Sequence, residues 1–427
     1  MGLGGKPTPD LNECRFLPQG PIYRFLRHVF VDRLTDSGRV MFWAGVLAMG
    51  AGQGTLVIQI YLVFCAIAAM FIVSIAMARL ARVRLKIHAD VPDRTTAGAT
   101  LKLPIQVSNP ERRTAVDVIL RDYSLPRDIR AVDEAGTAVP PLAGGDATLI
   151  TRSLEFTRRG HFVLHGIRQE TVFPWGIWRD LVVHAEEHGV LVYPRFHPLI
   201  ALDIPAGRRY QPGGIALSSS LGDSIEFVGT REFRDGDPVR AIHWRTWARL
   251  GKPAVKEFQE EYFCRVALLL DTFLPAKPTK AEREAFEAAI SLSAAIADCL
   301  SREEYVIDIF AAGPEIYYLQ SGRSLAYLEN VLDILACLEP CHEPPFEKVA
   351  PVLAENLASV TTTIVVLLDW DAHRDEMVRV IRDYGSAVKV ILVRDGAPTH
   401  DFAGAASLGA APLTHLRVSD VAGVESL

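Results

Sequence analysis

The longest uncharged stretch of the chain runs from Val40 to Ala78 and contains no Asp, Glu, Lys, Arg or His. Because about 20 apolar residues cross a bilayer as one helix, this stretch is long enough for nearly two helices. A glycine-rich segment, residues 50–54, interrupts it in the middle, where a turn would fall. We therefore predict a transmembrane helical hairpin over residues 38–80, with a single span as the alternative.

Basic residues lie on both sides of this stretch. They are Arg24, Arg27, Arg33 and Arg39 before it, and Arg79, Arg82, Arg84 and Lys86 after it. The positive-inside rule places basic flanks in the cytoplasm, and a hairpin keeps both flanks there. We expect a multi-pass protein of the inner membrane, anchored in the lipid bilayer with both termini cytoplasmic and with a cytoplasmic juxtamembrane segment over residues 1–37.

Beyond the uncharged stretch, the apolar positions change to a period of two. Residues 101–107 alternate in the manner of a half-buried strand. Further strands are predicted at residues 116–120, 149–156, 161–164 and 190–193. Several short strands at this spacing favour an all-β, immunoglobulin-like sandwich over residues 84–200. Residues 201–225 are rich in Gly, Ser and Arg without periodicity, and they predict a linker.

From residue 262 to residue 427, apolar strands alternate with helices. The predicted strands are residues 266–270, 305–310, 315–319, 362–368 and 387–393. The predicted helices are residues 281–300, 324–338, 346–358 and 373–384. This alternation predicts a doubly wound α/β domain with a parallel sheet. Ligands of such sheets bind at the carboxyl ends of the strands, where Asp271 and Asp369 stand.

Between the linker and the α/β domain, residues 226–261 form a segment rich in arginine and tryptophan. Asp237 followed by proline predicts the start of a helix, and Gly251 predicts its end. The stripe of this helix that we expect to face a core comprises Val239, Ile242, Thr246 and Leu250. Arginine and tryptophan on the neighbouring stripes indicate a surface that binds another protein. An ion-paired helix that joins two domains is the alternative.

Composition narrows the class of protein only a little. Apolar residues make up 49% of the chain, which is sufficient for several cores, and the net charge of −6 gives no reason to expect nucleic acid. The six cysteines are scattered along the chain, so they do not form a disulfide framework. Their pattern fits a reducing compartment.

One set of residues resembles a family signature. The set comprises Arg231, Glu232, Phe233, Gly236, Asp237, Arg240, Ile242, His243, Trp244, Ala248 and Arg249. It resembles the signature of the domain-of-unknown-function family 58, and the resemblance covers most of the chain. The resemblance implies a membrane hairpin, a β domain and a C-terminal von Willebrand factor A-like domain. Relatives resemble companions of MoxR-type AAA+ ATPases, so the resemblance also implies a partner of that kind.

A von Willebrand A-like domain usually binds a divalent cation through an Asp-x-Ser-x-Ser loop after its first strand. In this chain Asp271 remains, but Phe273 and Pro275 stand in place of the two serines. With Asp369 as a second carboxylate, the oxygen ligands for Mg²⁺ are incomplete. Two interpretations stay open. Either Asp271 and Asp369 hold Mg²⁺ in a metal-dependent ligand-binding module, or Asp271 caps the following loop and no cofactor is needed.

The sequence contains no Gly-x-Ser-x-Gly elbow and no glycine-rich phosphate loop. An acid/base pair of His243 with Asp237 or Glu232 is the weakest hypothesis, because residues six apart on a helix face different ways. We expect a non-enzymatic, membrane-anchored adaptor or assembly factor that acts through protein contacts.

Overall fold

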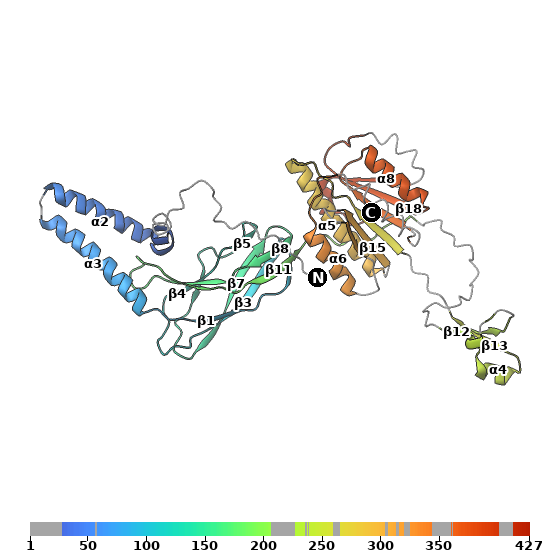
Figure 1. The fold of residues 1–427 in the computed structure, drawn as a ribbon, viewed down its shortest axis with the longest axis horizontal. Coiled ribbons are helices and arrows are strands. Elements are labelled where there is room, and N and C mark those ends of the chain that lie inside the picture. Colours follow the sequence, from blue (N-terminus) through green and yellow to red (C-terminus); the bar gives the residue numbers. More distant parts are fainter. Residues whose placement is uncertain are drawn as a thin grey trace. The chain divides into compact units, whose positions relative to one another are not determined.

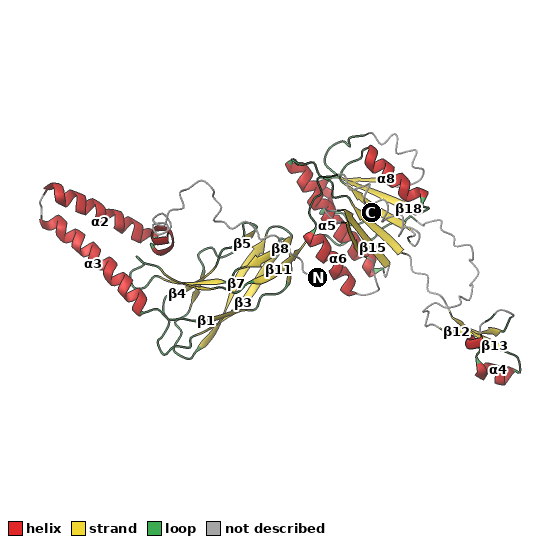
Figure 2. Cartoon of the chain, viewed as in Figure 1, coloured by secondary structure: helices red, strands yellow, loops and turns green. Residues whose placement is uncertain are grey.

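The computed structural model describes most of the chain, with gaps. The described residues are 28–55, 58–205, 227–234, 237, 239–258, 265–303, 306–312, 316–319, 325–343, 360, 362–400 and 413–427. The chain divides into two compact units, Met1–Val192 and Tyr193–Leu427. Figure 1 shows the elements in chain order, and Figure 2 separates helices from strands.

The first unit begins with a short π-helix, His28–Arg33, and two α-helices, α2 (Asp36–Thr55) and α3 (Ile58–Leu80). The two α-helices pack against each other (Figure 1). Gly45 of α2 faces Ile67 of α3, and Gly52 faces Tyr61. These pairings run in opposite directions along the chain, so α2 and α3 are antiparallel. Small residues at such positions let two helix backbones approach closely.

Among the described helices, α3 alone is long and apolar enough to cross a membrane. Helix α2 does not meet that criterion, since it contains Asp36, Arg39 and several glycines. One candidate span is therefore found where the hairpin prediction expected two.

The rest of the first unit is a β domain of three sheets. One four-stranded sheet has the order β1 (Lys86–Ala89), β3 (Thr100–Ser108), β7 (Ala147–Phe156) and β5 (Ile129–Ala131). A second has the order β10 (Asp180–His184), β9 (Ile167–Thr171), β4 (Val118–Asp122) and β6 (Thr137–Val139). The third comprises β2 (Arg94–Thr96), β11 (His188–Tyr193) and β8 (Gly160–Leu164). All pairings within the first two sheets are antiparallel.

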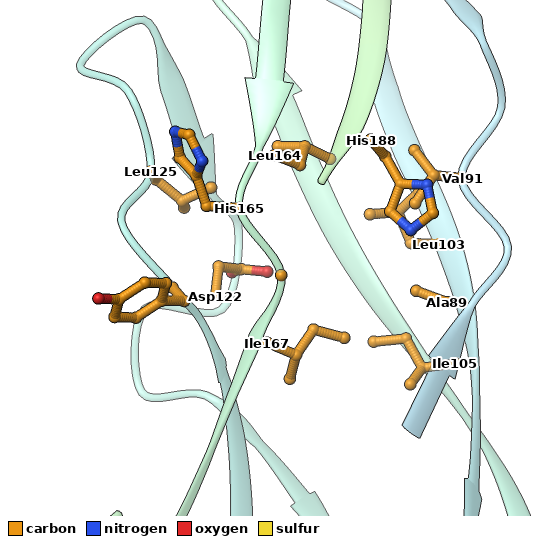
Figure 3. Close-up of a pocket in the computed structure, with 12 residues that line it drawn as sticks. Ala89, Val91, Leu103, Ile105, Asp122, Leu125, Leu164, His165, Ile167 and His188 are labelled. Carbon is orange, nitrogen blue, oxygen red and sulfur yellow. The ribbon is translucent and has the colours of Figure 1, made fainter. Parts of the chain in front are cut away.

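The prediction of an all-β domain is confirmed as far as these antiparallel strands. Residues 101–107 lie within β3, whose buried side chains alternate with exposed ones along the strand. A small cavity between the sheets is lined by Leu103, Ile105 and Leu164 together with Asp122 and His188 (Figure 3). Its volume of about 30 Å³ accommodates about two water molecules, so it is no pocket for an organic ligand.

The second unit contains a six-stranded sheet. Its order is β16 (Ile316–Leu319), β15 (Val306–Ala312), β14 (Arg265–Leu270), β17 (Thr362–Leu367), β18 (Ala387–Val393) and β19 (Leu413–Leu416). Every pairing is parallel except that of β16 with β15. The described helices of this unit's sheet domain are α5 (Lys280–Arg302), α6 (Leu325–Cys337), α8 (Ala372–Asp383) and α9 (Val418–Val421).

The prediction of a parallel α/β sheet is confirmed. Strand β17 is buried along its whole length, as expected for a central strand covered on both faces. Helix α5 begins with a capping box between Thr279 and Glu282 and buries a long apolar stripe in the main core. The predicted helix at residues 346–358 lies outside the described residues, and β19 and α9 were not predicted.

The α/β unit starts earlier in the chain than the sequence indicates. Leu199 and Leu202 are buried in its main core. Lys389 of β18 donates a hydrogen bond to the carbonyl of Asp203 at 2.7 Å, and Thr362 of β17 donates one to the carbonyl of Pro205. The division between units therefore falls at residues 192 and 193 rather than at 200, and residues 201–205 pack on the sheet domain instead of forming a linker.

Candidate functional site

The arginine- and tryptophan-rich segment folds as a helix flanked by a strand pair. Strand β12 (Phe227–Glu232) pairs antiparallel with β13 (Ala254–Phe258). Between them lie a 3-10 turn (Val239–Ala241) and helix α4 (Trp244–Leu250). We call residues 227–258 the contact module.

The predicted start of its helix at Asp237 is wrong. Ile242 forms an antiparallel bridge with Val255, and the N–H of His243 donates to the carbonyl of Ala254 at 2.8 Å. The chain is therefore held against β13 just before the helix, and α4 begins only at Trp244. This tertiary contact overrides the local helix signal of the Asp–Pro pair.

His243 caps this helix. Its Nδ1 accepts a hydrogen bond from the N–H of Thr246 at 3.3 Å and lies 2.6 Å from the Thr246 hydroxyl. At the other end, Gly251 has a φ of 67° and donates its N–H to the carbonyl of Trp247. The predicted helix end is confirmed. The Nδ1 atom of His243 is therefore engaged in the cap.

Asp237 shapes the loop before the helix instead of capping the helix. Its two carboxylate oxygens accept hydrogen bonds from Arg231 at 2.7 and 2.8 Å. The backbone N–H of Arg234 donates to the same carboxylate at 2.8 Å. The Arg231 hydrogen bonds, followed by the Arg234 amide, lower the pKa of Asp237 to about 2. The two signature residues therefore form a bidentate pair across a tight loop.

This pair predicts an acid-sensitive loop. The pKa of Asp237 is lower in the folded chain than its ordinary value of 3.8, so the pair stabilises the loop fully above about pH 4. The stabilisation is lost as the pH falls toward 2. Hydrogen exchange at the Arg234 amide as a function of pH measures this. In Arg231→Gln the loss of protection shifts to higher pH; an unchanged profile in that variant would contradict the assigned cause.

The outer face of α4 carries the exposed aromatic and cationic side chains. The Trp244 side chain is 61% exposed and stacks on Trp247, with ring centroids 5.3 Å apart and an interplanar angle of 19°. Arg245 and Arg249 of the same helix are exposed, and so is Arg240 of the preceding turn. Within the described part of the chain, none of the three has a carboxylate partner, so this face has a surplus of positive charge.

The predicted core-facing stripe is only half buried. Ile242 and Thr246 are buried, whereas Val239 and Leu250 are exposed. Since the helix begins at Trp244, Val239 belongs to the preceding turn and leaves the stripe. Ala248 is exposed on the same helix.

The remaining signature residues lie at the other edge of the module. Glu232 is exposed and pairs with Lys252 at 3.3 Å, and the N–H of Phe233 donates to the carbonyl of Pro253 at 2.9 Å. Gly236 lies outside the described residues. Around the Glu232–Lys252 pair is an open groove of about 320 Å³. The groove is lined by Thr230, Arg231, Glu232, Leu250, Lys252, Pro253 and Ala254.

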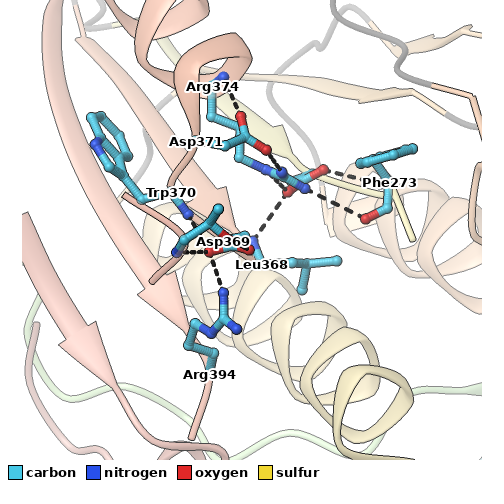
Figure 4. Close-up of polar contacts among 9 residues, drawn as sticks. Phe273, Leu368, Asp369, Trp370, Asp371, Arg374 and Arg394 are labelled. Carbon is cyan, nitrogen blue, oxygen red and sulfur yellow. Dashed lines mark hydrogen bonds and ion pairs between the residues drawn. The ribbon is translucent and has the colours of Figure 1, made fainter. Parts of the chain in front are cut away.

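A second cluster lies at the carboxyl ends of β14 and β17 (Figure 4). Both carboxylate oxygens of the buried Asp271 are engaged: one accepts from the N–H of Phe273 at 3.0 Å. The other accepts from the N–H of Leu368 at 3.1 Å and from Nε of Arg374 at 2.7 Å. The Arg374 side chain is only 3% exposed and also pairs with Asp371. Burial acts to lower the pKa of Arg374, but the two carboxylates outweigh it and raise the pKa.

Asp369 is engaged in a similar way. Its carboxylate accepts hydrogen bonds from the N–H of Trp370 at 2.7 Å and from the N–H and hydroxyl of Thr399 at 2.9 and 2.6 Å. Arg394 forms an ion pair with it. Burial acts to raise the pKa of Asp369, but the hydrogen bonds from Thr399 and Arg394 outweigh burial and lower it.

The donor set of this cluster does not fit Mg²⁺. Each of the two carboxylates predicted as metal ligands is already neutralised by its own arginine, and Asp271 has no free oxygen. The described part of the chain contains no group of three His, Cys, Asp or Glu side chains arranged to hold an ion. Asp271 does cap its loop through Phe273. Arg374 and Arg394 were not predicted, because neither belongs to the Asp271 loop.

A third cluster joins the two helices of the first unit to its β domain. Asp180 at the start of β10 is buried, with a side chain 3% exposed. It accepts hydrogen bonds from Nη1 of Arg33 at 2.9 Å and from Nε and Nη2 of Arg82 at 2.5 Å. The hydrogen bond to Asp180 raises the pKa of Arg82. We call Arg33, Arg82 and Asp180 the hairpin clamp.

Further contacts next to the clamp join the segment before α2 to the backbone of the β domain. The hydroxyl of Thr35 donates to the carbonyl of Gly176, and Leu34 bridges Trp178. A Cβ added at Gly38 would lie 2.2 Å from the carbonyl oxygen of Ile177, so only glycine fits there. Since Arg33 precedes α2 and Arg82 follows α3, one carboxylate fixes both outer ends of the helix pair to the same edge of the β domain.

The part of the chain that matches a family model contains most of the contact module and the Asp271 cluster. Residues 229–398 match the model of a family described as "Protein of unknown function DUF58". Over 205 residues the chain is 25% identical to the uncharacterized protein YeaD of Bacillus subtilis (strain 168), covering 46% of this chain and 49% of that protein. The chain thus spans about half the length of this curated relative.

Solved structures give only distant similarities. The CARDB domain of PF1109 from Pyrococcus furiosus is 16% identical over 25% of this chain and 93% of that chain, with a TM-score of 0.18. Proximal thread matrix protein 1 from the mussel byssus is 10% identical over 38% of this chain and 46% of that chain, with a TM-score of 0.28. These scores are too low to support a fold assignment.

Proposed function

We propose that this protein is a membrane-anchored adaptor or assembly factor that binds a partner protein through its contact module. The observation that carries the proposal is the exposed surface of α4 and of the turn before it. There, the stacked Trp244 and Trp247 lie beside three exposed arginines that lack carboxylate partners among the described residues. Tryptophan and arginine are the side chains that most often dominate binding energy at protein interfaces. The surplus of positive charge favours a partner with an acidic surface.

The anchor in this proposal is the α2–α3 hairpin, placed as a multi-pass segment of the inner membrane. Helix α3 has the length and composition of a span. Helix α2 packs along it and exposes large apolar side chains such as Trp43 and Leu47. Arg33 and Arg82 meet at one carboxylate, which supports both basic flanks being on the same side of the bilayer. By the positive-inside rule that side is the cytoplasm.

The α/β domain is proposed to be von Willebrand factor A-like, with its Asp271 cluster held by arginine. The parallel sheet and the position of Asp271 after β14 support this assignment. The signature that runs from Arg231 to Arg249 resembles that of relatives associated with MoxR-type AAA+ ATPases. We therefore propose an ATPase of that type as the partner, with the chain acting as a non-enzymatic component beside it.

Affinity recovery of partners from detergent-solubilised membranes tests the contact role. With Arg240→Ala/Trp244→Ala we expect at least a 10-fold loss of partner recovery, because two hot-spot side chains each contribute about 2 kcal/mol or more. The matched control is Arg130→Ala/Trp175→Ala, which removes an exposed arginine and an exposed tryptophan of the β domain. Equal recovery with both double variants, each correctly folded, would rule out the contact module as the binding surface.

A further inference from the structure

Three arginines surround one buried carboxylate on the β10–β9–β4 sheet. Glu170 of β9 has a side chain only 2% exposed. Its Oε2 lies 3.2 Å from Nε of Arg179 and 3.6 Å from Nε of Arg121. Its Oε1 pairs with Nη2 of Arg168. We call Arg121, Arg168, Arg179 and Glu170 the arginine cradle.

Strand register explains how these side chains meet. Arg121 of β4 lies directly opposite Arg168 of β9, and Arg168 and Glu170 are two residues apart on one strand. They therefore share one face of the sheet. Asp180 of the hairpin clamp pairs with Thr171 instead, which places its side chain on the other face.

The cradle has more cationic groups than its own carboxylate can neutralise. Three guanidinium groups and one carboxylate leave a formal surplus of two positive charges. The atoms of Arg121 and Arg179 that lie nearest to the Glu170 carboxylate are their Nε atoms. All three arginines are partly exposed, and no other residue of the described chain pairs with them. Forked N–H donors of this kind match the oxygens of a phosphate group.

The cradle lies next to the ends of the helix pair. The N–H of Arg179 donates to the carbonyl of Arg33 at 2.7 Å, immediately before α2. Arg168 is opposite Val183, three residues along β10 from Asp180, or about 10 Å at the rise of a strand. Arg168 and Arg179 of the cradle therefore lie within about 10 Å of Asp180 in the hairpin clamp. That distance is close to the range over which a charged membrane surface attracts basic groups.

We infer that the arginine cradle binds the phosphate group of an anionic phospholipid in the leaflet beside the hairpin clamp. This inference rests on the proposed membrane anchoring, because the helix pair sets the distance between the cradle and the headgroups. Binding brings phosphate oxygens to the partly exposed guanidinium groups, while Glu170 keeps the three side chains in position.

Titration of the full chain in dodecyl maltoside micelles tests the inference, with native mass spectrometry as the readout. The probes are dioctanoyl phosphatidylglycerol, dioctanoyl phosphatidylcholine and inorganic phosphate. Phosphatidylglycerol is expected to bind, and the other two to bind at least 10-fold more weakly. Arg168→Gln/Arg179→Gln is expected to weaken phosphatidylglycerol binding about 30-fold. This is the factor that corresponds to the loss of two basic groups, each of which contributes about 1 kcal/mol near an anionic surface. Arg130→Gln, which removes an exposed arginine of another sheet, leaves it unchanged.

A triple variant controls for misfolding of the double variant. The double variant leaves the buried negative charge of Glu170 with fewer positive partners. The triple variant Arg168→Gln/Glu170→Gln/Arg179→Gln removes that buried charge as well. The triple variant must show the same weakening. Unchanged phosphatidylglycerol affinity in either folded variant would overturn the inference, and so would inorganic phosphate or phosphatidylcholine binding as tightly as phosphatidylglycerol.

Membrane fractionation separates this outcome from failure of the proposed anchor. A chain that does not sediment with membranes refutes the anchoring. A chain that does sediment but binds phosphatidylglycerol equally with and without its cradle arginines refutes the cradle alone.

Discussion

Replacing Asp271 with alanine lowers the free energy of unfolding of the α/β unit by about 3–5 kcal/mol, the range found when one partner of a buried ion pair is removed. The reason is the position of Arg374, whose guanidinium is buried and lies 2.7 Å from Asp271. Asp371 remains as a second partner on the more exposed side. It keeps the effect near the lower end of that range.

Urea unfolding of the full chain in detergent measures this change, with tryptophan fluorescence, to which the buried Trp370 contributes, as the readout. Asp371→Ala is the control: it removes the more exposed partner of the same arginine together with the side-chain cap of α8, and it lowers stability by about 1–2 kcal/mol. A smaller loss with Asp271→Ala than with Asp371→Ala would contradict the assignment of Asp271 as the main partner.

The double variant Asp271→Ala/Arg374→Met distinguishes a paired arginine from a metal site. Removing both charges leaves no buried ion, so most of the lost stability returns. Mg²⁺ at millimolar concentration is expected to leave the unfolding midpoint of the unsubstituted chain unchanged. A midpoint that rises with Mg²⁺ and loses this response in Asp271→Ala would support a metal-dependent module instead.

Replacing Asp180 with alanine has the second largest expected effect, a loss of about 2–4 kcal/mol in the coupling of the helix pair to the β domain. The guanidinium groups of Arg33 and Arg82 lose their shared carboxylate. Both are partly exposed, so hydration of these groups offsets part of the lost free energy. Faster hydrogen exchange at Gly176–Asp180 and easier proteolysis near Arg82 report the release.

The control for this change is Asp36→Ala. That carboxylate pairs with Arg39 on the same helix pair but is 98% exposed, and such pairs contribute about 0.5 kcal/mol or less. Equal exchange rates in the two variants would show that Asp180 does not hold the helices to the β domain.

Much of the architecture follows from periodicity in the sequence. Strand β3 alternates apolar and polar residues, β17 ends in the apolar run Ile-Val-Val-Leu, and α3 is uncharged for its first 21 residues, so each was predictable from its own segment. Strands β9 and β10 were missed. Strand β9 reads Ile-Arg-Gln-Glu-Thr; Gln169 donates to the carbonyl of Val83, and Glu170 pairs with Arg121 and Arg168.

The candidate sites depended on contacts between distant segments. The helix start at Trp244 is set by Val255 of β13, and the Asp271 cluster is completed by Arg374, 103 residues away. Phe273 and Pro275 stand in place of the two serines of a metal-binding loop, but no pattern in the sequence indicates that the Arg374 guanidinium lies beside Asp271.

Site-specific photo-crosslinking from position 244 in intact cells tests the central claim most directly. A benzophenone side chain replaces Trp244 in one variant and Arg130, on the β domain, in another. We predict a discrete adduct with one partner protein from position 244, absent from position 130 and lost when Arg240→Ala is added. No adduct from position 244, or the same adducts from both positions, would contradict the proposed adaptor function.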